Sequence, residues 1–279
     1  MGYDSRCRDD GQGKADVMHK TVATLWQVMG EATALYFRDA PSYEAWLTQT
    51  AWLVMSGEPA AGVNMGLVTG DAAGGGASEG AARRALGEIV GRLRARKVPA
   101  MLFLAGQAAA GLAGPAAELG LKPLKSVPLM THLEDRGSPR PSAYKVEAIT
   151  TEASLADSHR LASDAFGDPL EVVSRAVGPR VLDAPGTTIF LACDDHRPVS
   201  TVTTVRAGPL VGIFNMATPP EAQRRGAAAA VLEHAMAYHR ERGARLFYLL
   251  ANDASKPLYE RLGFEAAAEV AIYLEQPAA

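Results

Sequence analysis

The residues best suited to chemistry form a short loop, Gln223-Arg-Arg-Gly-Ala-Ala228, between a predicted strand and a long predicted helix. Pro219 and Pro220 end the strand, because proline has no N–H to donate to a sheet. The first amides of a helix lack intrahelical acceptors, and the helix dipole favours anions at that end. Gly226 permits a positive φ, which lets successive amides converge on one point. The loop therefore predicts an anion site, to which Arg224 and Arg225 add positive charge.

Known phosphate-binding fingerprints are absent from this loop. No Gly-Lys-Ser/Thr follows the glycine, and the sequence has no G-x-G-x-x-G, so neither a nucleoside-triphosphate loop nor a dinucleotide loop is indicated. A helix start with Arg and Gly also has a purely structural interpretation, as a strand-to-helix turn. A second motif is needed to choose between the two.

That second motif is Asn252-Asp-Ala-Ser-Lys-Pro-Leu-Tyr-Glu-Arg-Leu-Gly-Phe264. Asn252 ends a predicted strand, Ser255 is expected at the helix N-cap, and the helix turns Leu258, Tyr259 and Leu262 inward. Together the two motifs resemble the GNAT acyltransferase superfamily over roughly residues 145–275. The loop matches that family's pyrophosphate pattern Q/R-x-x-G-x-G/A, and the second stretch matches its Asn, Leu-Tyr and Gly-Phe positions.

The resemblance implies an enzyme that moves an acyl group from acyl-coenzyme A, here acetyl-CoA, to an amine. The cofactor would lie between splayed strands 210–217 and 244–250. The expected cofactor-binding residues are Met216, Ala217 and Thr218 along the pantetheine arm, Gln223, Arg224, Arg225, Gly226, Ala227 and Ala228 around the diphosphate, and Asn252 and Ser255. A backbone N–H near Met216 would face the thioester oxygen. Tyr259 is the expected general acid for the departing sulfur.

Each of these roles has a structural alternative. Tyr259 could be an ordinary core tyrosine, and Asn252 could simply end a strand in a turn. The general base is the weakest point of the resemblance, because the strand Ile213-Phe-Asn-Met-Ala217 carries no acid. Asn215 could only orient a water, which leaves Asp168, Glu171 or solvent to remove the proton.

The elements that must position these residues predict an α/β (α+β) fold of mixed, mostly antiparallel sheets flanked by helices. In the second half they are, in chain order, a helix over 152–165, a looser segment through 183, a hairpin of strands 188–193 and 199–205, a strand over 210–217, a helix over 227–242, a strand over 244–250, a helix ending at Leu262, and a strand over 269–274. In the first half a helix over 81–96, a strand over 98–104, a helix ending near Leu119 and a strand over 127–133 repeat the end of this pattern.

The repeat predicts two tandem GNAT-like domains. The corners Leu119-Gly-Leu121 and Leu262-Gly-Phe264 lie 143 residues apart, and at that offset Tyr259 maps to Ala116 and Asn252 to Ala109. The stretch 71–79 has no pyrophosphate pattern. The first domain, residues 1–135, is therefore expected to be degenerate, joined by a Pro-rich linker over 136–143 to a catalytic domain over 144–279.

Length and composition agree with two domains. The chain has 279 residues, 48 % hydrophobic and 21 % charged, with a net charge of −3. These values argue against wholesale disorder and against nucleic acid as the main partner, and no apolar run is long enough for a membrane span. Two cysteines cannot form a disulfide framework, so a cytoplasmic setting is expected. His234 and His239 diverge on their helix, so no metal site is expected. The sequence leaves open whether the chain forms a homodimer.

Three functions fit these observations. The first is an acetyl-CoA-dependent N-acetyltransferase in which a small-molecule amine attacks the thioester directly. The second is a tandem acetyltransferase of the mycothiol-synthase type, which is similar in length and doubling. The third is a coenzyme A-binding module without turnover, which the missing strand carboxylate favours and the presence of Asn252 and Tyr259 opposes.

Overall fold

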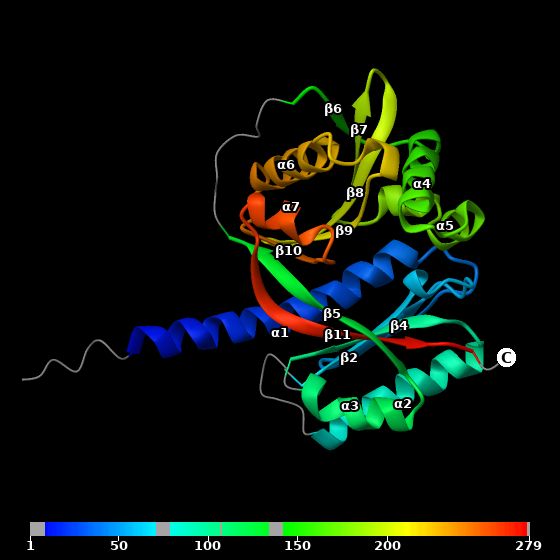
Figure 1. Ribbon diagram of the computed structural model, residues 1–279, viewed down its shortest axis with the longest axis vertical. Helices are drawn as coiled ribbons and strands as arrows, with labels where there is room; N and C mark the ends of the chain where they lie inside the picture. The colour runs from blue at the N-terminus through cyan, green and yellow to red at the C-terminus, as the bar shows by residue number, and fades with distance from the viewer. Residues whose placement is uncertain (1–8, 71–78, 107, 134–141, 278–279) are drawn as a thin grey trace, which may run out of the picture.

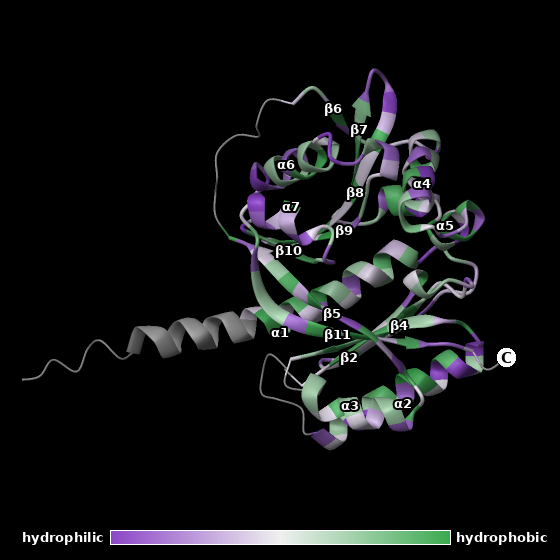
Figure 2. Cartoon of the chain, viewed as in Figure 1, coloured by the Kyte–Doolittle hydropathy of each residue, from purple (hydrophilic) through white to green (hydrophobic). Residues whose placement is uncertain are grey.

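The computed structural model describes residues 9–70, 79–106, 108–133 and 142–277. In this part of the chain a single 11-stranded sheet runs through both halves, in the order β1-β2-β3-β4-β11-β5-β10-β9-β8-β7-β6. Helices cover both faces of the sheet (Figure 1). Helices such as α2 (Glu79–Arg96) and α5 (Leu170–Ala176) mix hydrophilic and hydrophobic segments, as helices with one face on a sheet do (Figure 2). No helix in the described ranges is both long and apolar enough to cross a bilayer.

The first half begins with the 29-residue helix α1 (Asp9–Phe37). Its strands are β1 (Glu44–Leu47), β2 (Ala51–Met55), β3 (Asn64–Thr69), β4 (Ala100–Ala105) and β5 (Lys122–His132), with α2, the 3₁₀ turn η2 (Ala61–Val63) and α3 (Ala108–Glu118) between them. Strands β1 to β3 pair antiparallel, and β3 pairs parallel to β4. Strands β2 and β4 are almost wholly apolar because helices cover both of their faces.

The second half repeats this arrangement. After β6 (Lys145–Ala148), α4 (Glu152–Phe166), α5 and η3 (Pro179–Asp183) come the antiparallel strands β7 (Thr187–Asp194), β8 (Arg197–Ala207) and β9 (Leu210–Ala217). The chain continues through η4 (Pro220–Ala222), α6 (Ala227–Arg240), β10 (Leu246–Leu250), α7 (Lys256–Arg261) and β11 (Glu265–Glu275). Strand β9 pairs parallel to β10, as β3 pairs to β4.

The last strand of each half belongs to the sheet of the other half. Strand β5 pairs antiparallel with β10, whereas β11 pairs antiparallel with β4. The two exchanged strands also pair with each other, so that they join the halves at the centre of the sheet (Figure 1). On β5, His132 packs edge-on against Phe247 and Phe264 of the second half. Neither half therefore has a complete sheet without the other.

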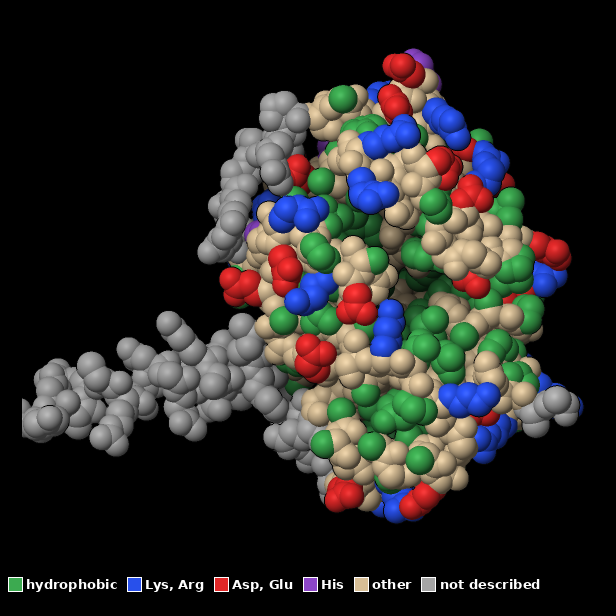
Figure 3. All heavy atoms as spheres, viewed as in Figure 1, with side chains coloured by type: hydrophobic (Ala, Val, Ile, Leu, Met, Phe, Trp, Pro, Cys, Tyr) green, Lys and Arg blue, Asp and Glu red, His purple; other side chains and the backbone are tan. Residues whose placement is uncertain are grey.

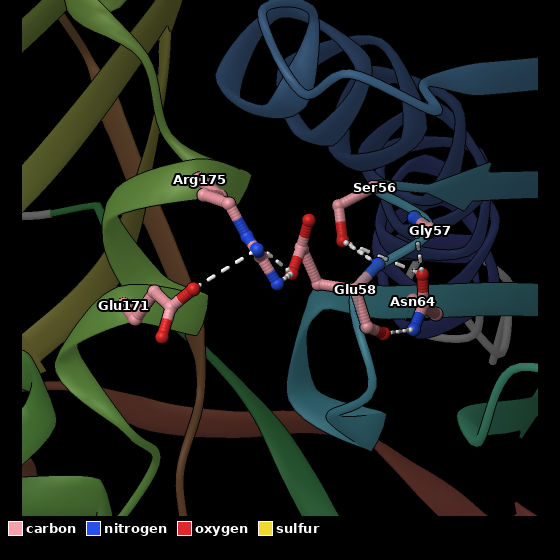
Figure 4. A network of polar contacts seen from close by, with 6 residues as sticks. All are labelled: Ser56, Gly57, Glu58, Asn64, Glu171 and Arg175. Carbon is pink, nitrogen blue, oxygen red and sulfur yellow. Dashed lines mark hydrogen bonds and ion pairs between the residues drawn. The ribbon is translucent and has the colours of Figure 1, made fainter.

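A cluster of polar contacts also joins the halves (Figure 4). Glu58, in the turn after β2, lies opposite Arg175 on α5, and the guanidinium Nη2 lies 2.7 Å from Glu58 Oε2. Near the end of α1, the Arg38 guanidinium donates to the carbonyl of Arg180 in η3, and the amide of Arg180 donates to Asp39. The C-terminal end of α1 is thus fixed against the second half.

Most elements predicted from the sequence are present within a few residues of their expected bounds. The strand predicted over 210–217 is β9 itself, the predicted hairpin is β7–β8, and the two halves share the expected order of elements. The segment predicted to be loose before residue 183 instead contains α5 and η3. The linker stretch 134–141 and residues 71–78 lie outside the described residues, so the domain boundaries and the degeneracy of the first half stay predictions.

Candidate functional site

Strands β9 and β10 separate after three residue pairs. They pair only at Leu210–Leu246, Val211–Phe247 and Gly212–Tyr248, and β9 then continues to Ala217 paired with β8 but not with β10. A β-bulge in β9 opens the sheet further: Thr203 of β8 faces Phe214, but Thr201 faces Ala217, which leaves one extra residue on β9. Asn215 in this bulge has φ +44°. The predicted splay is therefore present, with unpaired β9 backbone at its mouth.

Burial changes along β9 at the same point. Val211 to Ile213 are buried, whereas Phe214, Asn215 and Met216 are only partly buried. A cleft beside a sheet needs such a break, because the rest of the strand is covered on both faces. Figure 3 shows a hollow near the middle of the molecule, where Figure 1 has β9, α5 and the C-terminal end of α1.

The loop after β9 has the conformation expected of an anion site. Gly226 is the N-cap of α6 with φ +92°, and Arg224 also has a positive φ of +60°. Among the described residues, no acceptor takes a hydrogen bond from the backbone amides of Arg224 to Ala229, and the first amide engaged is that of Ala230, which donates to the Gly226 carbonyl. Six consecutive amides at a helix N-terminus are therefore available to a diphosphate.

Neighbouring side chains hold this loop in place from two sides. The Gln223 side-chain amide donates to the Thr218 carbonyl at 2.9 Å, and the Tyr144 hydroxyl donates to the Arg225 carbonyl at 2.9 Å. The Ser200 and Thr218 hydroxyls lie 2.8 Å apart, which ties the end of β9 to β8. The fixed loop can therefore bind an anion with little ordering cost. Gln223, a predicted cofactor residue, here supports the loop through its side chain.

Tyr259 reaches the bulge from α7. Its side chain is buried, and its hydroxyl donates to Met216 Sδ at 3.5 Å. Burial raises the pKa of Tyr259 to about 12, although hydrogen bonding with Ser255 opposes the shift. The phenol consequently keeps its proton at neutral pH, as a proton donor must. The structure thus brings Tyr259 and Met216 together at the mouth of the splay.

Asn252 and Ser255 form the turn that starts α7. The Asn252 side-chain oxygen accepts from the Ser255 amide at 2.9 Å, and the Ser255 hydroxyl donates to the Asn252 carbonyl. Ser255 occupies the N-cap position, but its side chain makes no capping bond. These contacts give both residues a structural role, and Asn252 remains exposed with its amide nitrogen outside the turn contacts.

The residues that surround the bulge on the acceptor side are not the two acids suggested by the sequence. Glu171 forms an ion pair with Arg175 at 3.0 Å and is largely exposed. Asp168 lies beside η2 of the first half, 3.7 Å from where a side chain at Gly62 would begin. The residue that does reach the bulge is Tyr36 of α1, whose hydroxyl lies against Thr203 and Asn215. No sequence motif pointed to Tyr36, because it lies in the other half of the chain.

A cavity of about 370 Å³ lies between α4, the β7–β8 turn and η4, and it adjoins the loop before α6 at Arg225. Arg160, Arg197 and Arg225 line it together with Asp157, Asp164, Asp194 and Glu221. Its charges largely cancel, and it does not include Met216 or Tyr259. We therefore place the chemistry at the splay and not in this cavity. Within the described residues, no group of three or more His, Cys, Asp or Glu side chains is arranged to hold a metal.

A splayed parallel pair, a bulge at its mouth and a free amide cradle at the next helix are features that suit the binding of an extended ligand with a diphosphate. The comparison with family models agrees: residues 160–264 match the Acetyltransferase (GNAT) family. The matched residues lie within the second half of the chain, from α4 to the corner after α7, and this part is similar to GNAT acetyltransferases. No curated protein matches the chain.

Solved structures show the same fold over nearly the whole chain. A GCN5-related N-acetyltransferase from Kribbella flavida is 17 % identical, with a TM-score of 0.58, and the match covers 90 % of this chain and 96 % of that one. Another from Sphaerobacter thermophilus is 17 % identical, with a TM-score of 0.56 and coverage of 87 % and 85 %. A tandem GNAT protein from the clavulanic acid biosynthesis pathway is 16 % identical, with a TM-score of 0.52 and coverage of 86 % and 85 %. At these identities the likeness concerns the fold alone.

Proposed function

We propose that this protein is an acetyl-CoA-dependent N-acetyltransferase that acetylates a small-molecule amine by direct attack on the thioester. The observation that carries the proposal is the set of unengaged amides from Arg224 to Ala229, in the loop that follows β9, together with the contact of Tyr259 with Met216 on β9. A diphosphate on these amides would direct the pantetheine arm into the splay. The low cysteine content favours a cytoplasmic setting for the reaction.

Each residue then has a defined task. The cofactor supplies an acyl thioester, and the amides of Arg224 to Ala228 hold its diphosphate. The free β9 backbone at Met216 to Thr218 pairs with the amide groups of the pantetheine, as an added strand would. An N–H near Met216 stabilises the negative charge that develops on the thioester oxygen. Tyr259 donates its proton to the departing sulfur.

The test is a continuous thiol-release assay with acetyl-CoA and a panel of primary amines, with the acetylated product verified by its mass shift. We expect thiol release that depends on one class of amine and adds one acetyl group to it. The same panel with propionyl-CoA measures the acyl length that the splay accepts. Coenzyme A binding measured by calorimetry without any thiol release across the panel would contradict catalysis.

A coenzyme A-binding module without turnover remains the second candidate, because β9 carries no carboxylate where the amine would approach. The two candidates share the same cofactor site, so binding alone does not separate them. The catalytic candidate predicts that Tyr259→Phe lowers the rate of acyl transfer, whereas the binding module has no such rate to lose.

A further inference from the structure

The bulge of β9 is covered from the first half of the chain. Helix α1 packs on the β9–β10 face opposite α6 and α7, where Tyr36, Phe214 and Tyr248 belong to one apolar cluster. Tyr36 is only partly buried, as is Asn215. A side chain that contacts the bulge and also keeps some exposure is suited to line an opening.

The hydroxyl of Tyr36 lies near two side chains of the second half. It lies against the side chains of Thr203 on β8 and Asn215 on β9. Burial raises the pKa of Tyr36 to about 12, and hydrogen bonding with Thr203 and Asn215 opposes that rise. The phenol is therefore neutral in the physiological range. Asn215 sits in a left-handed conformation, which asparagine tolerates better than most residues.

A second buried phenol lies on the same face. The Tyr248 hydroxyl is fully buried and has no hydrogen-bond partner within the described residues, and burial raises the pKa of Tyr248. A Cβ added at Gly212 would lie 2.7 Å from this hydroxyl and 2.4 Å from the Phe214 ring, so only glycine lets these side chains lie across β9. The Tyr248 hydroxyl is thus a second polar group on the face of β9 and β10 that α1 covers.

No charged group contributes to the state of Tyr36. The charge of Glu31, one and a half turns earlier on α1, reaches Tyr248 and further raises its pKa, but Glu31 is exposed and accepts a hydrogen bond from Gln27. At the end of α1, Arg38 and Asp39 are engaged with Arg180 of η3. Within the part of the chain that the structure describes, the groups that act on the Tyr36 hydroxyl are therefore an amide and a hydroxyl, and none is an anion.

We propose that Tyr36 and Asn215 form the binding site for the acceptor nitrogen, with the buried Thr203 behind the Tyr36 hydroxyl, so that the first half of the chain completes the acceptor site of the second half. This inference rests on the proposed acyl transfer. A site without an anion makes a buried ammonium unfavourable, because nothing offsets the loss of hydration. The site therefore selects the uncharged amine, which is the form that attacks, and no carboxylate base is required.

The reaction balances without one. The amine lone pair forms the new C–N bond, and the C–S bond breaks. The sulfur leaves with the Tyr259 proton, and the proton lost by the nitrogen returns through water to Tyr259. Before the attack, the Tyr36 hydroxyl oxygen and the Asn215 carboxamide oxygen accept hydrogen bonds from the two N–H groups of the neutral primary amine. Once one of these protons has passed to water, one of the two hydrogen bonds remains. Neither Tyr36 nor Asn215 changes its net protonation.

The test compares Tyr36→Phe with Tyr273→Phe in the full chain. Tyr273 lies on β11 and packs under the helices of the first half, so this variant removes one phenol hydroxyl away from the bulge. With the best amine of the panel, we expect Tyr36→Phe to raise the acceptor KM about 10-fold and to leave the acetyl-CoA KM and the coenzyme A affinity unchanged. Tyr273→Phe is expected to change none of these.

A pH profile gives a second readout, which a merely structural role would not move. For two amines of different basicity, the rise of kcat/KM with pH should follow the pKa of each amine. Asn215→Asp, which keeps the side-chain shape, places a carboxylate at the bulge and should shift this rise to lower pH for both amines.

An unchanged acceptor KM in Tyr36→Phe, or a wild-type profile that is the same for both amines, would overturn the inference while leaving acyl transfer intact. A wild-type chain that acetylates no amine would remove the proposed function and this inference together.

Discussion

The carboxylate of Glu58 accepts two hydrogen bonds from the guanidinium of Arg175, at 2.7 and 3.0 Å, across the boundary between the two halves (Figure 4). The Glu58 backbone is itself held, because its amide donates to Ser56 Oγ and its carbonyl accepts from the buried side chain of Asn64. Arg175 also pairs with Glu171, one turn earlier on α5. The first half thereby fixes the position of a helix beside the acceptor side of β9.

Arg175→Leu should weaken this junction. The Glu58 side chain is only 9 % exposed, and a buried carboxylate that loses its partner is destabilising. We expect a lower Tm and a raised acceptor KM, because α5 packs beside the end of β9, where Val173 and Ala217 belong to one apolar cluster. Calorimetric unfolding and steady-state kinetics check both. The matched control is Glu171→Gln, since Glu171 is 78 % exposed and surface pairs contribute little; equal losses in the two variants would contradict a specific role of Glu58.

Gly226→Leu should weaken coenzyme A binding by at least about 10-fold, since a side chain there would project into the amide cradle and prefers a negative φ. Nothing in the described chain lies within 4 Å of an added Cβ, so the loss would not come from a clash within the protein. Titration calorimetry with coenzyme A measures it. Gly208→Leu is the control, because Gly208 also has a positive φ and open space but lies in the β8–β9 turn. If only stability fell, and by the same amount in both variants, the diphosphate would have to bind elsewhere.

Tyr259→Phe should lower kcat about 10²-fold with little change in coenzyme A affinity, as expected when a proton donor is removed. The raised pKa, about 12, keeps the phenol protonated, so wild-type turnover should not fall through ionisation of Tyr259 until the pH approaches that value. The pH profile of kcat under saturating substrates checks this. If Tyr259→Phe lowers kcat only slightly, both with acetyl-CoA and with a thioester of a more acidic thiol, the sulfur leaves without a proton donor. Tyr259 would then be a core residue.

The sequence predicted the site's backbone better than its surroundings. The loop Gln223–Ala228 and the strand ending at Ala217 follow from local chemistry, namely prolines, a glycine and an apolar run, and the structure has both in the expected form. Tyr36 could not be found this way, because its contact with Asn215 spans most of the chain and depends on the packing of α1. The exchange of β5 and β11 was equally hidden, since an antiparallel partner in either half satisfies the same strand pattern.

Because β11 of the second half pairs with β4 of the first half, we expect the two halves to unfold together. Arg94 of α2 donates from Nε and Nη2 to the two oxygens of Glu275 at the end of β11, at 2.9 and 3.2 Å. Glu275→Ala removes these bonds from a nearly buried carboxylate, although Arg94 itself is half exposed. We expect a loss of about 1 kcal/mol, or roughly 2–4 °C in Tm for a chain of this size, in a single calorimetric transition. Two resolved transitions, with only one displaced, would show independent halves.

Two buried histidines set the response of stability to acid. His159 on α4 has an unpartnered Nε2 within the described residues, and burial lowers its pKa to about 4. His239 on α6 forms a hydrogen bond with Thr204. Burial, together with the nearby charges of Arg206 and Arg242, lowers the pKa of His239 to about 4. Because the folded state binds protons less readily than the unfolded state, their effect on stability is absent above about pH 6.5. Stability should then fall by roughly 1.4 kcal/mol per pH unit for each histidine as the pH drops from about 6.5 towards 4. Urea unfolding at several pH values measures this slope. His159→Asn, which cannot take up a proton, should remove about half of it, and a slope that is the same in this variant would assign acid sensitivity to other groups.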